Sequence, residues 1–366
     1  MFNLNMLVMK KSTLVLMSLL ALSFAVKAQQ YVSTEPANRN VVLEEFGGRG
    51  CGWCPSGHSI SNTIEANNPG RVWTVNIHAG GYASTSYPNL NTADGTTIHN
   101  AYSFTGYPEG FVNRSTENSQ GRGAWEGLAN AQLSQASECN MAGSVVMNEG
   151  TRKASITVEV YYTGSSNADE NYLTVAMLQD SILGSQSDYA GGNPSQWIGD
   201  QYVHMHVLRD IVSESVWGDP ISPTSQGTLI TKTYEYQIPA SIGDPNGVAV
   251  NLDNVYFLAW VSEQYMETPT RPILNSCKLE KTYIPQGVKS ELANSLRLYP
   301  NPASKTLNVE GEMTSVEVYN TVGQCLLSKE VNGNTHIDLS GYSNGIYFLR
   351  VNNNGETEVR KFSVNR

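Results

Sequence analysis

A Cys-x-x-Cys pair set between a strand and a helix is the feature that most constrains the fold. The run Asn40–Phe46 predicts a strand, and the segment Cys54–Ala66 predicts a helix that begins at the second cysteine. A cysteine at a helix N-terminus lies near unpaired amides and the positive end of the helix dipole, which favour its thiolate. Such a thiolate can attack a substrate disulfide, and the second cysteine then resolves the mixed disulfide. Cys51 is therefore the predicted attacking residue, with an exposed sulfur, and Cys54 the more shielded resolving residue.

Three interpretations of this cysteine pair stay open at the level of sequence. The pair is redox-active, or it is a purely structural disulfide, or it belongs to a metal site with His58 and His78. Zinc prefers four ligands, and the sequence contains no second Cys-x-x-Cys. The redox interpretation is favoured because strand, cysteine pair, helix and a later Pro108 follow in that order. No metal and no cofactor is expected.

The surrounding sequence alternates strands with helices and then changes to a period of two. Alternation up to about Ser137 predicts an α/β unit, with further elements at Arg71–His78, Gly95–Ser103, Gly110–Asn113 and Ala124–Ala136. From about Asn140 to Tyr283, apolar residues recur at every second position, as at Ile156, Val158 and Val160, which is typical of a β-sandwich. The Gly-rich and aromatic-rich stretch Ser185–Pro223 is expected to be an extended loop region.

Several residues in this middle stretch have both a functional and a packing interpretation. His204 and His206 would share one side of a strand, as metal ligands do, although no acidic or thiol group stands beside them. Trp197 and Trp217 would form either a sugar-stacking platform or anchors for loops. In each case packing is the favoured interpretation.

The N-terminal residues predict export. Lys10 and Lys11 precede the apolar run Leu14–Val26, and Ala28 closes a small-residue cleavage site, so the mature chain is expected to begin at Gln29. No other segment has the apolar length of a membrane-spanning helix. In an oxidising compartment disulfides persist, so Cys139 and Cys277 would be either a second disulfide or two buried free thiols. The net charge of −10, without a basic stripe, excludes nucleic acid as a partner.

The last 71 residues, 296–366, read as a compact all-β module after a polar linker at 284–295. Its motifs are Leu298-Tyr299-Pro300-Asn301-Pro302, Val316-Glu317-Val318-Tyr319-Asn320 and Gly345-Ile346-Tyr347-Phe348-Leu349. This module resembles the type A sorting domain of the type IX secretion system. The resemblance implies passage across the outer membrane by the type IX machinery, followed by removal of the module by a sortase.

The cysteine-pair region resembles the thioredoxin superfamily. Glu45, six residues before Cys51, stands where that family often has a buried acid that assists proton transfer to the resolving cysteine. Thr105-Gly106-Tyr107-Pro108 is similar to the family's loop before a cis-proline, which faces the disulfide and receives the substrate backbone. The resemblance therefore implies a catalytic set of Cys51, Cys54, Glu45 and Pro108.

Scattered motifs over Val41–Leu279, among them Ile77-His78-Ala79-Gly80 and the segment Tyr202–Arg209, resemble the outer-membrane-protein-28-related family. The predicted organisation is multidomain, α/β plus all-β: a signal peptide at 1–28, a thioredoxin-like domain at 29–138, a β-sandwich domain at 139–283, a linker at 284–295 and a small β-sandwich sorting domain at 296–366. The expected function is that of a cell-surface or secreted protein capable of thiol-disulfide exchange, which would make it a thiol-disulfide oxidoreductase acting on protein thiols or disulfides. The alternative is a surface binding protein or adhesin, with surface ligands, in which the Cys51–Cys54 disulfide is only structural.

Overall fold

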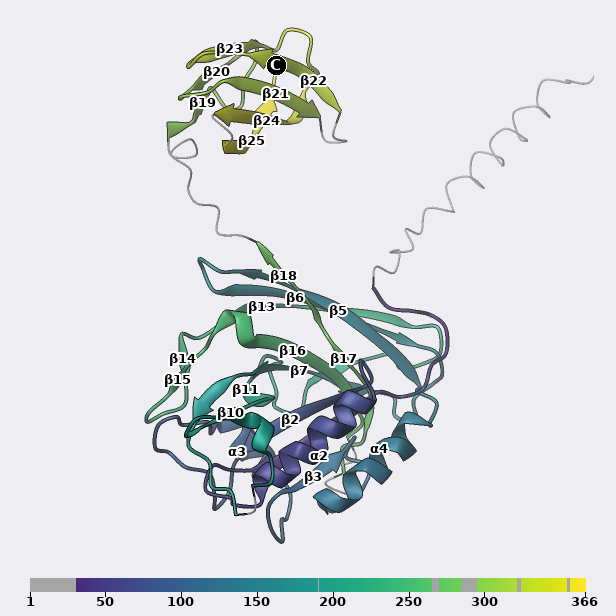
Figure 1. Ribbon diagram of the computed structural model, residues 1–366. Coiled ribbons are helices and arrows are strands. Elements are labelled where there is room, and N and C mark those ends of the chain that lie inside the picture. The colour runs from purple at the N-terminus through teal and green to yellow at the C-terminus, as the bar shows by residue number, and fades with distance from the viewer. Residues whose placement is uncertain (1–30, 190, 265–269, 285–294, 321–323, 354–355) are drawn as a thin grey trace, which may run out of the picture. The chain divides into compact units, whose positions relative to one another are not determined.

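A computed structural model describes residues 31–189, 191–264, 270–284, 295–320, 324–353 and 356–366 (Figure 1). The chain forms two compact units. The first consists of the residues up to Met147 together with Thr151–Tyr283, and the second of Asn148–Gly150 and Ile284–Arg366. The predicted signal peptide at 1–28 and nearly all of the predicted linker at 284–295 lie outside the described residues. The domain limits derived from the sequence stay predictions.

The α/β part of the first unit contains the strands and helices that the sequence predicts, with small shifts at their ends, and one further short strand, β4 (Gln120–Gly121). In chain order the predicted elements are β1 (Val41–Gly47), α2 (Cys54–Asn67), β2 (Val72–His78), α3 (Ala93–Asn100), β3 (Glu109–Val112) and α4 (Trp125–Leu133). β1 pairs in parallel with β2 and antiparallel with β3, and β4 continues the sheet beyond β3. The resulting strand order is β2-β1-β3-β4.

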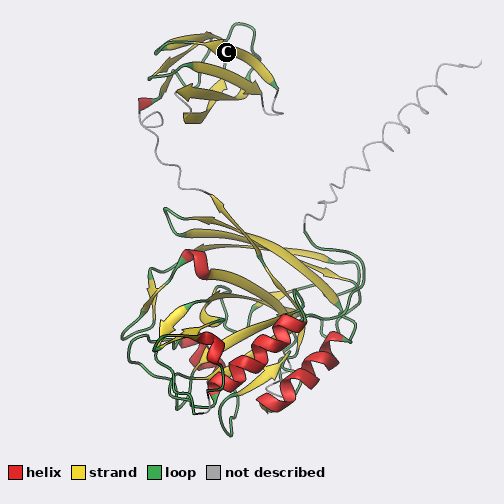
Figure 2. Cartoon of the chain, in the orientation of Figure 1, coloured by secondary structure: helices red, strands yellow, loops and turns green. Residues whose placement is uncertain are grey.

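Helices cover both faces of these strands. α2 and α4 lie side by side on one of the faces (Figure 2). Residues Val41 and Leu43 of β1 pack with Ile64 of α2 and Trp125 of α4 on one face. Val42 and Phe46, which point to the opposite face of β1, pack in a second cluster with Ile98 of α3. Because both faces are covered, every residue of β1 is buried, including two glutamates.

The β-rich part of the first unit adds strands to the same sheet and builds a second sheet over it. Its strands are β5 (Cys139–Asn148), β6 (Lys153–Tyr162), β7 (Asn171–Gln179), β8 (Ile182–Gly184), β9 (Trp197–Ile198), β10 (Gln201–His204), β11 (Val207–Ile211), β12 (Asp219–Ile221), β13 (Leu229–Gln237), β14 (Ser241–Ile242), β15 (Val248–Ala249), β16 (Val255–Ser262), β17 (Ile273–Lys278) and β18 (Glu280–Ile284). The long sheet runs β17-β16-β7-β11-β2-β1-β3-β4, with β12 attached to β7.

A four-stranded sheet, in the order β13-β6-β5-β18, packs against one face of β7, β16 and β17. Val175 and Met177 of β7 face this sandwich core together with Phe257 of β16, whereas Ala176 and Leu178 of β7 join the cluster on the other face. The sandwich predicted from period-two alternation is therefore present. One of its two sheets is continuous with the α/β strands.

The stretch Ser185–Pro223 is not the extended loop region that the sequence predicts. It contains β9, β10, β11 and β12, and β11 lies in the middle of the long sheet between β2 and β7. The prediction was wrong because these strands are short and alternation over two to five residues gives no clear periodicity. Their pairing depends on partners distant in the sequence, such as Val207 with Asn76.

The second unit is a small all-β sandwich, as the sequence predicts. One sheet has the order β19-β20-β23 and the other β22-β21-β24-β25, formed by β19 (Arg297–Tyr299), β20 (Thr306–Glu310), β21 (Ser315–Asn320), β22 (Cys325–Glu330), β23 (Thr335–Asp338), β24 (Gly345–Asn353) and β25 (Glu356–Val364). Alternating residues, such as Val316 and Val318 of β21 and Leu349 and Val351 of β24, fill its core.

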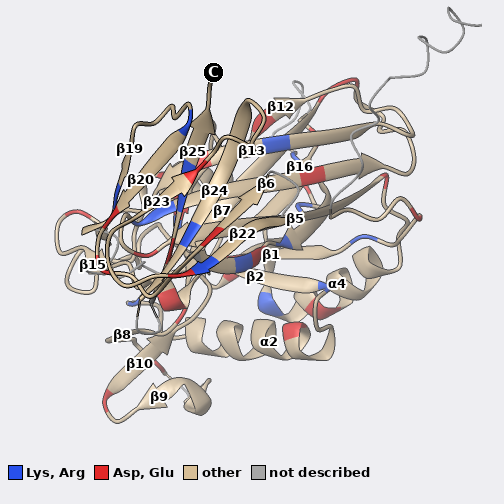
Figure 3. Ribbon diagram, turned by 90° about the horizontal axis from the view of Figure 1, so that it is seen from above, with Lys and Arg blue, Asp and Glu red and all other residues tan. Residues whose placement is uncertain are grey.

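Charged residues are sparse and of mixed sign on the ribbon. In the view of Figure 3, Lys and Arg are interspersed with Asp and Glu and are not gathered along one element. Among the helices of the described residues, none is both long enough and apolar enough to cross a membrane.

Candidate functional site

Cys51 and Cys54 form a disulfide at the N-terminus of α2, with their Cα atoms 5.4 Å apart. Pro55 occupies the first turn of the helix, where its missing N–H leaves no hydrogen bond unmade. The sulfur of Cys54 lies against Gly47 at the end of β1, because a Cβ atom built on this glycine would be 2.6 Å from that sulfur. Glycine at this position therefore makes room for the disulfide between β1 and α2.

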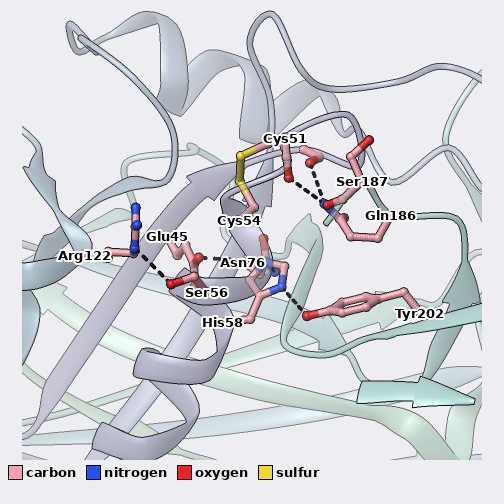
Figure 4. The surroundings of a disulfide bond; sticks show 11 residues. Glu45, Cys51, Cys54, Ser56, His58, Asn76, Arg122, Gln186, Ser187 and Tyr202 are labelled. Carbon is pink, nitrogen blue, oxygen red and sulfur yellow. Dashed lines mark hydrogen bonds and ion pairs between the residues drawn. A yellow bond between two sulfur atoms is a disulfide. The ribbon is translucent and has the colours of Figure 1, made fainter. Parts of the chain in front are cut away.

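Both cysteines are buried, with exposed fractions of 3% for Cys51 and 1% for Cys54. The expectation of an exposed Cys51 sulfur was therefore wrong. The reason is a segment distant in the sequence, Ser185–Tyr189, which we call the strap (Figure 4).

The strap is held against the Cys51–Cys54 loop mainly by backbone groups. The Ser187 N–H donates to the Arg49 carbonyl at 2.8 Å, and the Tyr189 N–H donates to the Gly52 carbonyl at 3.0 Å. Gln186 adds its side-chain amide, which donates to the Cys51 carbonyl at 2.9 Å and to the Gly48 carbonyl at 3.4 Å. Four backbone carbonyls of the loop thus accept hydrogen bonds from the strap.

Aromatic side chains extend this cover. The Tyr189 ring meets the Trp53 ring edge-on, with centroids 6.0 Å apart. A Cβ atom on Gly52 would be 2.4 Å from the Tyr189 ring, so the ring lies directly on the backbone between the two cysteines. Arg122 places its guanidinium over the other ring, 5.6 Å from the Trp53 centroid.

The proline that the sequence singles out lies on the α2 side of the disulfide. The Tyr107–Pro108 peptide bond is cis, and Pro108 is buried. A Cβ atom on Gly57 would be 2.7 Å from Pro108 Cγ and 2.4 Å from Glu45 Oε1. The first turns of α2 therefore bring Cys54, Pro108 and Glu45 together.

Glu45 is a buried carboxyl beneath the disulfide. It points to the same face of β1 as Gly47, two residues further on, and it is 1% exposed. Its Oε2 accepts a hydrogen bond from the Ser61 hydroxyl at 3.1 Å, while Oε1 makes no hydrogen bond. Burial raises the pKa of Glu45 to about 8, and the Ser61 hydrogen bond and the charge of Arg122 offset only part of that effect. Glu45 is therefore mostly protonated at neutral pH.

A buried polar network behind the disulfide was missed by sequence reasoning. His58 Nδ1 lies 2.7 Å from the Tyr202 hydroxyl, and Nε2 lies 3.0 Å from the amide nitrogen of Asn76. Because the amide can only donate, Nε2 accepts and Nδ1 carries the proton. Burial lowers the pKa of His58 to about 3, so the imidazole is neutral. Tyr202 comes from the segment assigned to a loop, and no local pattern links it to α2.

His204 and His206 do not share one side of a strand. His204 is the last residue of β10 and packs against His78 with ring centroids 5.4 Å apart. His206 adopts a left-handed backbone with φ of 58°, outside a strand, and its Nδ1 contacts the Tyr256 hydroxyl at 2.9 Å. Within the described residues, no group of three or more His, Cys, Asp and Glu side chains is placed to hold a metal ion.

The two tryptophans anchor different regions. Trp197 packs against Tyr202 with ring centroids 5.3 Å apart. Trp217 carries the guanidinium of Arg271 over its ring, 3.9 Å from the centroid. These separate contacts agree with the packing interpretation.

The other cysteines are free thiols. Cys139 and Cys277 are buried in the core of the sandwich, and burial raises the pKa of both thiols, that of Cys277 to about 12. The structure therefore has the second of the two arrangements expected from the sequence. Cys325, in the second unit, is exposed.

We predict that replacing Gln186 by alanine exposes the disulfide. Loss of the hydrogen bonds to the Cys51 and Gly48 carbonyls should favour opening of the strap by about 1 kcal/mol, so reduction by dithiothreitol should be about fivefold faster. The measurement is the rate at which Cys51 and Cys54 become alkylated, followed by mass spectrometry. Gln237→Ala is the matched control, because the exposed Gln237 amide donates to the Thr151 carbonyl at 2.9 Å. Equal rates for both variants and the unmodified protein would contradict the role of the strap.

We predict a pH-dependent stability that comes from Glu45. Because the folded-state pKa is raised above the unfolded value of about 4.3, the stabilisation is complete below pH 4 and is lost as the pH rises towards about 8. Relative to Glu45→Gln, the unfolding free energy should fall by up to about 1.4 kcal/mol per pH unit within this window. Urea unfolding can be followed by tryptophan fluorescence, since all six tryptophans lie before residue 284. Glu126→Gln, at an exposed position of α4, is the control, and parallel pH curves for the unmodified protein and Glu45→Gln would refute this assignment.

Comparisons with known proteins give two family matches. Residues 95–268 match the family described as outer membrane protein Omp28, and residues 297–365 match the secretion system C-terminal sorting domain. The first match begins after Cys54, so it covers Pro108, the strap and β11 but not the disulfide. No curated protein matches the chain.

Solved structures provide relatives at low sequence identity. The chain is similar to HBP35 of Porphyromonas gingivalis, with 20% identity, coverage of 90% of this chain and 98% of that chain, and a TM-score of 0.54. A domain of the outer membrane lipoprotein Omp28 from Porphyromonas gingivalis has 15% identity, covers 40% of this chain and 90% of its own, and has a TM-score of 0.26.

The two family matches also locate the protein. A sorting domain of this kind directs the protein that carries it to the type IX secretion machinery. The protein is therefore exported to the outer-membrane surface or the extracellular space. The chain therefore carries an Omp28 family domain and, after it, the C-terminal sorting domain of the type IX secretion system.

Proposed function

We propose that this exported protein has a thioredoxin-like unit, at residues 29–138, with thiol-disulfide exchange capacity. The observation that carries the proposal is the juxtaposition of the Cys51–Cys54 disulfide at the start of α2 with buried Glu45 and cis-Pro108. The strand order β2-β1-β3-β4, with α2 and α4 on one face and α3 on the other, supports a thioredoxin-like fold. The similarity to HBP35 supports the fold alone.

In the proposed reaction, the reduced protein transfers two electrons to a substrate disulfide. The Cys51 thiolate forms a bond to one substrate sulfur, and the other substrate sulfur leaves and takes up a proton. Cys54, as a thiolate, then attacks the Cys51 sulfur; the Cys51–Cys54 bond forms again, and the substrate sulfur that was bound to Cys51 leaves and takes up a proton. The helix N-terminus stabilises the Cys51 thiolate, because the amides of the first turn point towards it.

Glu45 is suited to donate a proton to Cys54 and to accept it back. Its protonated form, favoured by burial, can donate to the Cys54 sulfur when the disulfide opens. The same carboxylate accepts that proton when the disulfide closes. Gly47 brings the Cys54 sulfur against the strand that carries Glu45, which places acid and sulfur on the same face of β1.

The strap restricts this chemistry to partners that can displace it. The carbonyls of Arg49 and Gly52 already accept hydrogen bonds from Ser187 and Tyr189. A substrate can approach the Cys51 sulfur only after these bonds break. Exchange in the proposed mechanism therefore begins with opening of the strap.

A surface binding protein with a structural disulfide is the second candidate. The observation that favours it is the burial of both sulfurs, because a permanently covered disulfide exchanges slowly. In that case the disulfide fixes the loop Gly48–Trp53, on which the strap rests, to the start of α2, and the ligands bind elsewhere on the surface.

A trapping experiment separates the two functions. In a Cys325→Ser background, which removes the exposed thiol of the second unit, Cys54→Ser should accumulate mixed disulfides with partner proteins through Cys51, because resolution is blocked. Cys51→Ser should accumulate few. Non-reducing gels and mass spectrometry of the adducts give the measurement. Equal trapping by the two variants would overturn the assignment of roles, and no trapping by either would support the structural disulfide.

A further inference from the structure

A hollow in the first unit lies apart from the disulfide. It has a volume of about 650 Å³ and lies between the N-terminal turn of α3, strand β11 and the β14–β15 hairpin. The side chains of Asn91, Asp94, Arg209 and Asp210 are among the polar groups of its walls, to which Asp244 also belongs. The proposed exchange reaction uses none of these residues.

Arg209 is the most unusual of these groups. It is 1% exposed, and its Nη2 donates to the carbonyls of Ile242 at 2.9 Å and Val248 at 3.3 Å. Its Nε and Nη1 atoms are buried without a hydrogen-bond partner, and among the described residues it makes no ion pair. Burying a cation with unused donors is costly, so an anionic group of a ligand would offset that cost.

A β-bulge brings Arg209 to this wall. The pairing of β11 with β7 shifts register between Leu208 and Asp210, which leaves Arg209 as the extra residue. In a regular strand, consecutive side chains point to opposite faces. The bulge removes this alternation, so that Arg209 and Asp210 both line the same hollow.

Acceptor groups line the same hollow. Asp94 Oδ2 and Asp210 Oδ1 accept from the same Ile211 N–H, at 2.8 and 3.1 Å, so the two carboxyl groups lie next to each other. Burial and the neighbouring Asp94 raise the pKa of Asp210 to about 6. Asn91 adds a buried Oδ1 without a hydrogen-bond partner. The Tyr236 hydroxyl donates to Asp210 Oδ2, so the carboxylates have hydrogen-bond donors but no cationic partner. A cationic group would relieve the repulsion between the two carboxylates, and its N–H groups would give Asn91 Oδ1 a donor.

We propose that this hollow binds a small zwitterion, an α-amino acid, with its carboxylate on Arg209 and its ammonium between Asp94 and Asp210. Unused donors and crowded acceptors occur in one pocket, and an α-amino acid carries the complementary charges on a single carbon. A simple anion would satisfy Arg209 and leave the carboxylates in repulsion. A simple amine would leave the guanidinium without a partner.

Calorimetric titration of the full-length protein tests the site. The probes are L-serine, L-leucine, L-aspartate and L-arginine, with propionate and ethylamine as ligands that keep only one of the two charges. At least one amino acid should bind saturably, and propionate and ethylamine at least tenfold more weakly. Saturable binding of propionate or ethylamine as tightly as any amino acid, or no saturable binding by any amino acid, would overturn the proposal.

Two variants locate the binding. Asp94→Asn keeps an oxygen that can accept from the Ile211 N–H but removes a negative charge, and it should weaken amino-acid binding about tenfold or more. Arg209→Lys should also weaken binding; if this buried substitution prevents folding, Asp94→Asn still decides the question. Asp253→Asn, at an exposed position outside this hollow, should bind like the unmodified protein. Unchanged affinity in Asp94→Asn would contradict the site.

Discussion

The pairing of β11 with β2 is the interaction on which the first unit depends. Asn76 holds it through its backbone, since the Asn76 N–H donates to the His206 carbonyl at 2.7 Å. Without this pairing, the edge of β2 would be open and the α/β strands would be separate from the sandwich strands. The Asn76 side chain in turn donates to His58 on α2. One residue therefore links the long sheet to the helix that carries the disulfide.

The same pairing explains how a distant segment covers the disulfide. β10 directly precedes β11 in the chain and brings Tyr202 to His58. The strap lies earlier in the same stretch of chain, before β9 and β10. The strap is held by a few hydrogen bonds, and the Tyr189 ring is still largely exposed, so its opening needs less free energy than unfolding of the sheet. The arrangement thus combines a fixed scaffold with a locally removable cover, which is consistent with exchange that depends on the partner.

Local elements of this fold could be predicted from the sequence, and long-range ones could not. The β1, α2 and β16 segments have strong periodicity or long apolar runs, and the cysteine spacing, the acid at Glu45 and the proline at 108 follow from short motifs. The position of β11 depends on pairing over more than a hundred residues, and so does the burial of Cys51. The bulge at Arg209 could not be predicted from the sequence either, because a register shift is a property of two paired strands and not of one segment.

In the proposed function, the covered disulfide exchanges electrons with protein substrates. Turbidity from insulin reduction, with dithiothreitol as electron donor, measures this exchange in the full-length protein and in a Cys51→Ser variant. Insulin should precipitate faster with the unmodified protein than with dithiothreitol alone, and Cys51→Ser should not accelerate the reaction. If both proteins leave the rate of dithiothreitol alone unchanged, or if Cys51→Ser is as active as the unmodified protein, the exchange function is contradicted.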